Sequence, residues 1–144
     1  MPARKASLID TTTPRGKRVQ RRLEREVVLW LATSGAEGRP HVVPVWFLWD
    51  GDSFLIYSLP GQKVRDIEAN PLVALHLDSN AEGGDVVRVD GTAARLRRHP
   101  AAYKVPAYVR KYAALIKSYG WTAESFSKDY HVVLRVRPTH FRHD

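Results

Sequence analysis

The chain has 144 residues, of which 44% are hydrophobic, and it carries a formal net charge of +8 and no cysteine. This length and composition suit one globular domain, and the lack of cysteine excludes disulfides, thiolate catalysis and Cys-ligated zinc. No apolar run approaches the roughly 20 residues of a membrane helix, and residues 1–10 lack the apolar segment of a secretory signal. We therefore expect a cytoplasmic protein that does not enter a membrane.

Positive charge gathers at the N-terminus. Residues 1–26 carry eight Lys and Arg against three Asp and Glu, whereas the other 118 residues carry 15 against 12. We interpret residues 1–18 as a flexible basic arm, in which residues 11–14 are turn formers, and residues 19–144 as the folded domain. Such an arm can touch nucleic acid, but charge runs are commonly just solvated, so nucleic acid is not expected as a partner.

The first half of the chain predicts one helix and three strands. Val19, Leu23 and Val27 recur every four residues and predict an amphipathic helix over residues 16–28. Strands are predicted over residues 27–33, 41–49 and 53–59, with a hairpin loop at 34–38 and the turn Asp50-Gly51-Asp52 between the last two.

The second half adds shorter helices and three more strands. A helix is predicted over residues 62–69, with Val64 and Ile67 inward, followed by strands at 72–77 and 86–96. Gly91 suggests a bulge or a close backbone approach. Residues 100–119 are helical with a break at Pro106, Thr122 caps a helix that ends at 128, and the last strand covers 130–136. The fold class is thus mainly β (β+α), a six-stranded antiparallel barrel with short peripheral helices.

The predicted strand 41–49 is apolar on both faces. Val43, Val45, Phe47 and Trp49 lie on one face, and Val42, Pro44, Trp46 and Leu48 lie on the other. One face fills the barrel, and the second needs a cover, which can be a subunit, a ligand or both.

The loop over residues 59–65 is the best candidate for a binding site. Lys63 at a helix N-terminus forms an anion site, Arg65 adds charge, and Tyr57 and Ser58 offer hydroxyls. Many helices begin with Gly-x-Lys, so the loop alone is a weak signal. Beside the two-sided apolar strand, it predicts a site for a flat aromatic cofactor with a phosphate tail.

Other chemistries find little support in the sequence. The six histidines are dispersed without a metal-binding spacing, so no metal site is predicted. GxSxG, GxGxxG and P-loop motifs are absent, which disfavours a serine hydrolase, a Rossmann fold and Walker-type ATP binding.

The aromatic residues are interpreted mainly as packing residues. Trp30 is expected in the core. Trp46 can floor a cofactor or dimer pocket and Trp121 can cover a site, although core or interface packing explains each of them. The stripe of Tyr108, Tyr112 and Tyr119 is also expected to pack rather than to react.

Three segments in order resemble a known superfamily. The run LATSGAEGRPHVVPVWFLWDGDSFLIYSLPGQKVRDIEANPLVALHLD, then VVRVDGTAA, then YHVVLRVRPTHFR, resembles the pyridoxamine 5′-phosphate oxidase-like flavin-binding superfamily. Within it, the chain is most similar to the branch of probable coenzyme F420 (deazaflavin)-dependent enzymes. The resemblance covers about residues 20–142. It implies a split β-barrel homodimer with two cofactor sites at the subunit interface.

The resemblance also implies which residues bind the cofactor. Val43, Pro44, Val45 and Trp46 would line its ring, Tyr57 and Ser58 would flank its phosphate, and Gln62 and Lys63 would contact the phosphate with Arg65 nearby. No catalytic side chain is assigned, because the cofactor carries the redox chemistry.

The chain differs from the oxidases proper at several positions, and these differences indicate which branch of the superfamily it resembles. Val43 stands where they have an arginine, Gln62-Lys63 where they have Arg-Lys, and Val86 where they have a ring-contacting glutamine. Their substrate-binding C-terminal Trp and Arg segment is missing, so vitamin B6 oxidation is not expected.

The implied function is an oxidoreductase that transfers hydride from reduced F420 to an unsaturated or quinone-like small molecule. One alternative is an FMN-dependent reductase or oxidase of the same fold. Another is a non-catalytic protein that binds or stores the cofactor.

Overall fold

The computed structural model describes residues 8–143, so residues 1–7 of the predicted arm lie outside the described residues. The described chain forms one sheet of seven strands, four α-helices and a short 3-10 helix. In chain order the elements are α1 (Pro14–Arg25), β1 (Leu29–Ser34), β2 (Pro40–Val45), β3 (Leu48–Trp49), β4 (Phe54–Ser58), α2 (Gln62–Ala69), β5 (Leu72–His76), β6 (Val87–Leu96), η1 (Ala102–Lys104), α3 (Pro106–Ser118), α4 (Ala123–Asp129) and β7 (Val132–His143). Helix α1 thus begins inside the stretch predicted as an arm.

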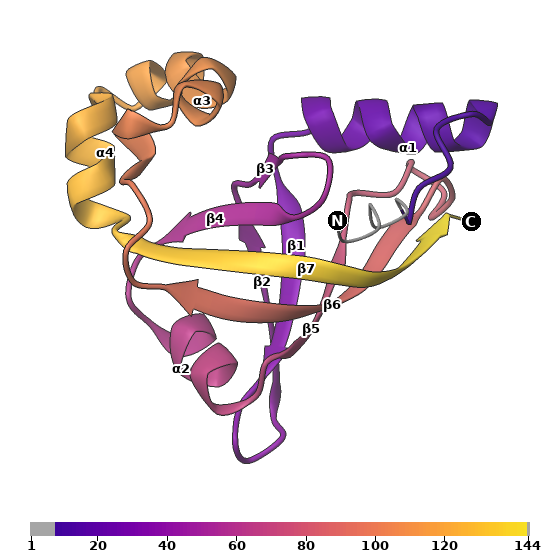
Figure 1. Ribbon diagram of the computed structural model, residues 1–144, viewed down its shortest axis with the longest axis horizontal. Coiled ribbons are helices and arrows are strands. Elements are labelled where there is room, and N and C mark those ends of the chain that lie inside the picture. The colour runs from indigo at the N-terminus through magenta and orange to yellow at the C-terminus, as the bar shows by residue number, and fades with distance from the viewer. Residues whose placement is uncertain (1–7, 144) are drawn as a thin grey trace, which may run out of the picture.

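The sheet is antiparallel throughout and curls into a split β-barrel, as predicted. Its strand order is β2-β1-β5-β6-β7-β4-β3 (Figure 1). The two edge strands, β2 and β3, are separated in the chain by only Trp46 and Phe47. The sheet therefore curls until its two edges come together at this pair of residues, which form the split.

The prediction of one continuous strand over residues 41–49 is wrong, and the sheet has seven strands rather than six. Phe47 leaves the strand because its backbone is bonded to α3. Its N–H donates to the Tyr112 hydroxyl at 2.7 Å, and its carbonyl accepts from Lys111 Nζ at 2.8 Å. These bonds satisfy backbone groups that would otherwise be buried without partners.

Strand β7 also extends seven residues beyond its predicted end and passes through Pro138. Pro138 lies opposite Gly91, where the register of β6 and β7 shifts between Asp90 and Gly91. A bulge needs no regular ladder N–H, so proline is tolerated there. The predicted irregularity at Gly91 is confirmed, and it explains why the proline does not end the strand.

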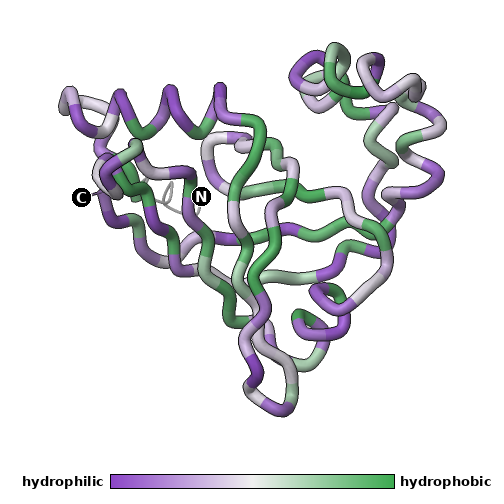
Figure 2. The backbone as a smooth tube through the Cα atoms, turned by 180° about the vertical axis from the view of Figure 1, so that it is seen from behind, coloured by the Kyte–Doolittle hydropathy of each residue, from purple (hydrophilic) through white to green (hydrophobic). Residues whose placement is uncertain are grey.

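Helix α1 covers one end of the barrel. Val19 and Leu23 are buried in the barrel core, while Lys17 and Arg21 are exposed. Figure 2 shows the resulting alternation of hydrophobic and hydrophilic residues along this helix. The amphipathic pattern read from the sequence is therefore the reason that α1 packs where it does.

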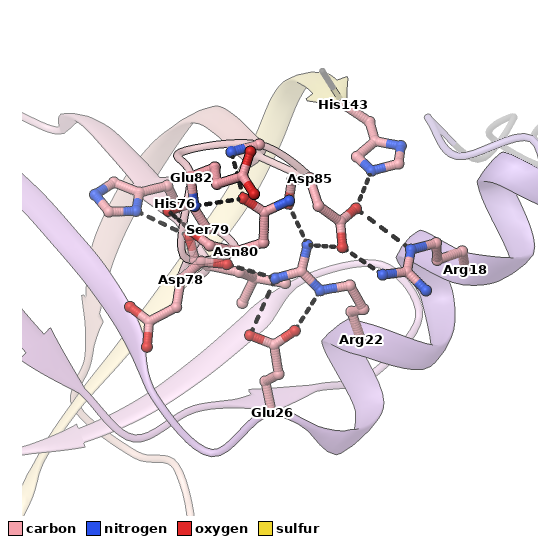
Figure 3. Close-up of polar contacts among 12 residues, drawn as sticks. Arg18, Arg22, Glu26, His76, Asp78, Ser79, Asn80, Glu82, Asp85 and His143 are labelled. Atoms are coloured by element: carbon pink, nitrogen blue, oxygen red, sulfur yellow. Dashed lines mark hydrogen bonds and ion pairs between the residues drawn. The ribbon is translucent and has the colours of Figure 1, made fainter.

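Asp85, in the loop before β6, fastens α1 to this end of the barrel (Figure 3). Its carboxylate pairs with Arg18 and lies 2.7 Å from His143 Nε2. Arg22 donates to the carbonyl oxygens of Asp85 and Asp78 at 2.5 and 2.6 Å. The hydrogen bond from Arg18, followed by that of His143, holds the pKa of Asp85 well below its usual range. The network joins α1, the loop before β6 and the end of β7.

The remaining helices build a second core outside the barrel. The α3–α4 pair packs on the outer face of β4 and β7, where Tyr108, Tyr112 and Phe126 meet Tyr57 and Val133. Packing is therefore confirmed for Tyr108 and Tyr112, which are fully buried. Between residues 8 and 143 no helix is both long and apolar enough to span a membrane.

Candidate functional site

A cavity of about 420 Å³ opens beside the split in the barrel. Its walls come from the ends of β2 and β4, the first turn of α2 and the connection between α3 and α4. It is lined by Val28, Pro44, Val45, Trp46, Tyr57, Ser58, Leu59, Lys63, Tyr119, Trp121, Phe126 and Tyr130. Six of the nine residues predicted to bind the cofactor share this cavity: Pro44, Val45, Trp46, Tyr57, Ser58 and Lys63.

One end of the cavity is polar. Lys63 Nζ donates to Ser58 Oγ at 2.9 Å, and Ser58 Oγ donates to the Leu59 carbonyl at 2.6 Å. No side chain caps the first turn of α2 after Gly61, so that turn keeps N–H groups without helical partners. Backbone N–H groups beside an ammonium form a site suited to an anion.

Lys63 is only partly exposed to solvent, and burial lowers its pKa. Within the described part of the chain it has no acidic partner and bonds only to the Ser58 hydroxyl. A half-buried cation without a counter-ion is costly unless a charged ligand offsets it. This charge therefore makes the polar end of the cavity suited to an anionic ligand.

The other walls of the cavity are aromatic. The Trp46 ring stacks on Tyr112, with centroids 4.6 Å apart, and on Phe126, with centroids 5.5 Å apart. Phe126 in turn stacks on Tyr130 at 4.5 Å. The prediction that Trp46 floors a pocket is consistent with this position, because its ring joins the cavity to the second core.

Tyr57 lines the cavity without offering its hydroxyl to it. The hydroxyl donates to the Pro100 carbonyl at 2.8 Å, and burial raises the pKa of Tyr57 to about 12. The hydroxyl expected to flank a phosphate is therefore engaged elsewhere, and the ring alone is available as a wall.

Three residues predicted to bind the cofactor lie outside the cavity. Val43 packs against the barrel core, and Arg65 is exposed and donates to the Gln62 side-chain oxygen at 3.0 Å. Gln62 turns to the buried carboxylate of Asp66 and donates to it at 2.7 Å. Consecutive residues of a helix point about 100° apart, and here Lys63 lines the cavity while Gln62 points to Asp66.

Asp66 anchors α2 to the first hairpin. Burial alone would raise its pKa, but hydrogen bonds from Gln62, Thr33 and His41 outweigh burial and lower it. The bonds to Thr33 and His41 measure 2.8 and 2.7 Å. The helix that carries Lys63 is thereby fixed to β1 and β2.

Four lining residues were not singled out from the sequence as walls of a site: Val28, Tyr119, Phe126 and Tyr130. Leu59 belongs to the loop that was predicted as a binding site. Tyr119 was read as part of a packing stripe, yet 59% of it is exposed. Trp121 does border the cavity, as its interpretation as a cover suggested. Phe126 falls in the helix predicted to end at 128, whereas Tyr130 begins the predicted last strand, so no single sequence pattern groups them as neighbours. No three His, Asp or Glu side chains among residues 8–143 gather closely enough to hold a metal ion.

A split barrel with an aromatic cavity and a cation at one end can accommodate a planar ring that carries an anionic group. The chain belongs to the pyridoxamine 5′-phosphate oxidase family, whose family model matches residues 16–143. No curated protein matches the chain significantly.

Solved structures share this fold. An F420 reductase is 28% identical, with 85% of this chain and 94% of that chain covered and a TM-score of 0.63. A FAD-binding protein from Mesorhizobium loti is 22% identical, with 87% and 88% covered and a TM-score of 0.63. HutZ, a heme storage protein from Vibrio cholerae, is 19% identical, with 86% and 89% covered and a TM-score of 0.61. The last two similarities concern the fold alone.

Proposed function

We propose that this protein is an F420-dependent oxidoreductase that reduces an unsaturated or quinone-like small molecule. The observation that carries the proposal is Lys63, a half-buried cation without an acidic partner at the polar end of an aromatic cavity. A ring can lie against Trp46 and Tyr57 while its anionic tail meets Lys63. The residues present therefore fit a deazaflavin or a flavin.

The chain's own residues would bind and orient this cofactor. Lys63, Ser58 and the first turn of α2 would hold the anionic group, and Pro44, Val45 and Trp46 would exclude water from the ring. When bound in its reduced form, F420 supplies a hydride. No side chain of the cavity is required to react, so the protein's contribution is binding, orientation and shielding.

F420 is preferred over FMN because a solved F420 reductase is 28% identical to this chain, with 85% of this chain covered. The Lys63 site itself suits either anion, so an FMN-dependent reductase or oxidase is the second candidate. Vitamin B6 oxidation is not proposed, because Val43 and Gln62 stand where the oxidases proper have arginines.

A non-catalytic role is the third candidate. The absence of any assigned catalytic side chain suits a protein that stores or carries a cofactor, and a heme storage protein has the same fold. Cofactor binding without turnover across a panel of quinones and enones would favour storage over reduction.

The proposal is tested by titrating the protein separately with F420 and with FMN while following ligand fluorescence. We expect micromolar binding of F420 and weaker binding of FMN. A protein that purifies yellow with bound flavin would select the FMN alternative. Binding of neither compound would contradict both the F420-dependent and the FMN-dependent candidates.

We also propose that the protein is a homodimer. Val42 and Leu72 are 55% and 64% exposed on the outer face of strands β2, β1 and β5. Pro44 lies on the same side of β2 as Val42 and also lines the cavity. A second copy placed on this face would therefore cover both the apolar residues and one side of the cavity.

A further inference from the structure

The aromatic surface of the cavity continues outward onto Tyr119 and Trp121, which we call the aromatic lip. The two rings stack with centroids 4.9 Å apart and planes 26° apart. They remain 59% and 38% exposed, although both border the cavity. Large aromatic side chains that stay exposed beside a cavity are typical of a ligand-binding surface.

The lip is held in place at both ends. Gly120, at φ 74°, ends α3, with its N–H donating to the Lys117 carbonyl and that of Trp121 donating to the Ile116 carbonyl. Such a pair of bonds around a left-handed glycine is a Schellman motif. Thr122 then starts α4 through reciprocal bonds with Ser125. Only four residues, 119–122, connect the two helices, so the lip is preorganised, and a ligand need not spend free energy ordering it.

Contacts between rings connect the lip to the cavity wall. Tyr119 lies 6.5 Å from Trp46 and Trp121 lies 6.3 Å from Phe126, between ring centroids, while Trp46 and Phe126 are 5.5 Å apart. With the contact between Tyr119 and Trp121, these four rings form a closed circuit. A planar ligand at the lip would therefore be next to whatever occupies the cavity.

Size and charge indicate what the lip accepts. The cavity volume of about 420 Å³ is in the lower part of the range for ligand pockets, and it suits one ring system. The exposed faces of the lip are additional aromatic surface. Among residues 8–143, Lys63 is the one charged side chain that lines the cavity, and it belongs to the polar end at α2. An uncharged planar ring matches the lip best, since aromatic faces attract other rings by offset stacking.

We propose that the aromatic lip is a second binding surface, specific for an uncharged planar ring, and that it holds the acceptor substrate of the reductase. The role as a substrate site rests on the proposed function, but the binding surface itself does not. Tyr119 and Trp121 are thus specificity-determining residues, distinct from the cofactor residues Lys63 and Ser58.

The test compares the binding of two probes by equilibrium dialysis: menadione, a planar uncharged quinone, and cyclohexenone, a non-planar enone. The variants are Trp121→Ala, Tyr119→Ala and, as a control, Tyr103→Ala, which removes a tyrosine that is 41% exposed away from the cavity. We expect each lip variant to weaken menadione binding by up to about tenfold, the upper end for loss of a stacked aromatic pair. The control and the binding of cyclohexenone should not change.

Two further measurements keep the lip separate from the cofactor site. Trp121→Phe retains a ring and should retain menadione binding, which distinguishes stacking from general damage to the fold. The Kd for F420 should change by less than about threefold in every lip variant, because a lost surface contact is usually worth no more than that.

The outcomes of these measurements are distinguishable. Unchanged menadione binding in both alanine variants would overturn the proposal that the lip binds a planar ring. A parallel loss of F420 and menadione binding would also overturn it, because the lip would then be part of the cofactor site. A wild-type protein that binds menadione at the lip but does not bind F420 would support the surface and contradict the proposed cofactor.

Discussion

Lys63 connects the local sequence to the proposed chemistry. Burial disfavours its charged form, so its pKa is below that of an ordinary lysine. Between this lowered pKa and the ordinary value the unfolded chain binds more protons, so the stability of the free protein rises with pH in that interval. Whereas burial favours the neutral form of Lys63, a bound anion favours the protonated form.

The affinity for an anionic cofactor should therefore fall as the pH rises through the lowered pKa of Lys63. The decrease should begin at a lower pH than for an ordinary lysine, whose pKa is near 10.5. Measuring the Kd for F420 over a pH series tests this, with Lys63→Met as the control that should lose the dependence. An affinity that rises with pH over the same range would exclude a role for the protonated lysine.

Tyr108 and Tyr112 lie one helical turn apart, and their hydroxyl groups are expected to affect the stability of the fold in opposite ways. The Tyr112 hydroxyl accepts from the Phe47 N–H and bonds to the carbonyls of Phe47 and Val27 at 2.9 and 2.7 Å. The Tyr108 hydroxyl is also buried but finds no hydrogen-bond partner among the described residues. A buried hydroxyl stabilises a fold only when it is hydrogen-bonded.

Tyr112→Phe should lower the free energy of unfolding by about 1–3 kcal/mol, because it leaves buried backbone groups unpaired. Tyr108→Phe should have no effect or should stabilise the protein, since it removes an unsatisfied polar atom. Urea unfolding of both variants gives the comparison. Equal destabilisation by the two substitutions would show that the Tyr112 hydroxyl does not hold the split of the barrel.

At the scale of elements, the bulge in β7 opposite Gly91 depends on that glycine. A Cβ on Gly91 would lie 2.7 Å from the Arg137 carbonyl oxygen and 3.0 Å from Val136 Cγ1. Neither neighbour can move freely, because both belong to the paired strand β7. Close approach of the two backbones therefore requires the absence of a side chain.

Gly91→Ala should destabilise the protein by about 1–3 kcal/mol through overpacking. The exposed Ala94 on the same strand provides the matched control. Ala94→Thr should stay within about 0.5 kcal/mol of the wild type. Thermal unfolding of both variants measures the difference, and a neutral Gly91→Ala would mean that β6 and β7 can separate without loss.

The elements that the sequence predicted well are determined by residues close to one another in the sequence. The bounds of α2, the Thr122 cap and the irregularity at Gly91 all follow from signals within a few residues. The break at Trp46 and Phe47 depends on Tyr112, which is 65 residues away from Phe47 in the chain. No local pattern contains that contact, so the strand was predicted as continuous.

The candidate site divides in the same way. The position of Lys63 beside Ser58 at the cavity was predictable because an ammonium beside an uncapped helix start is a local arrangement. The positions of Gln62 and Arg65 outside the cavity were not, because the choice of which face of α2 meets the cavity is made by the contact of Asp66 with β1 and β2. The lining residues from α3 and α4 depend equally on how distant segments pack.

At the scale of the whole molecule, the exposed apolar face of β2, β1 and β5 leads to the homodimer proposal. Val42→Glu would place a charge in the middle of that face, where a buried unpaired carboxylate is costly. We expect a shift from dimer to monomer by light scattering coupled to size exclusion. Glu82→Gln, a charge change in an exposed loop on the described surface, should leave the dimer intact. A wild-type protein that is monomeric at high concentration would contradict the proposal.

The most direct test of the proposed site is the Kd for F420 of the wild type, Lys63→Met and Arg65→Ala, measured by ligand fluorescence. Methionine keeps the packing of the lysine stem and removes its charge. Loss of a hydrogen bond to a charged group predicts binding about 10- to 100-fold weaker for Lys63→Met, with little change for the outward-facing Arg65→Ala. Wild-type affinity in Lys63→Met, or equal losses in the two variants, would contradict the placement of the anionic group at Lys63.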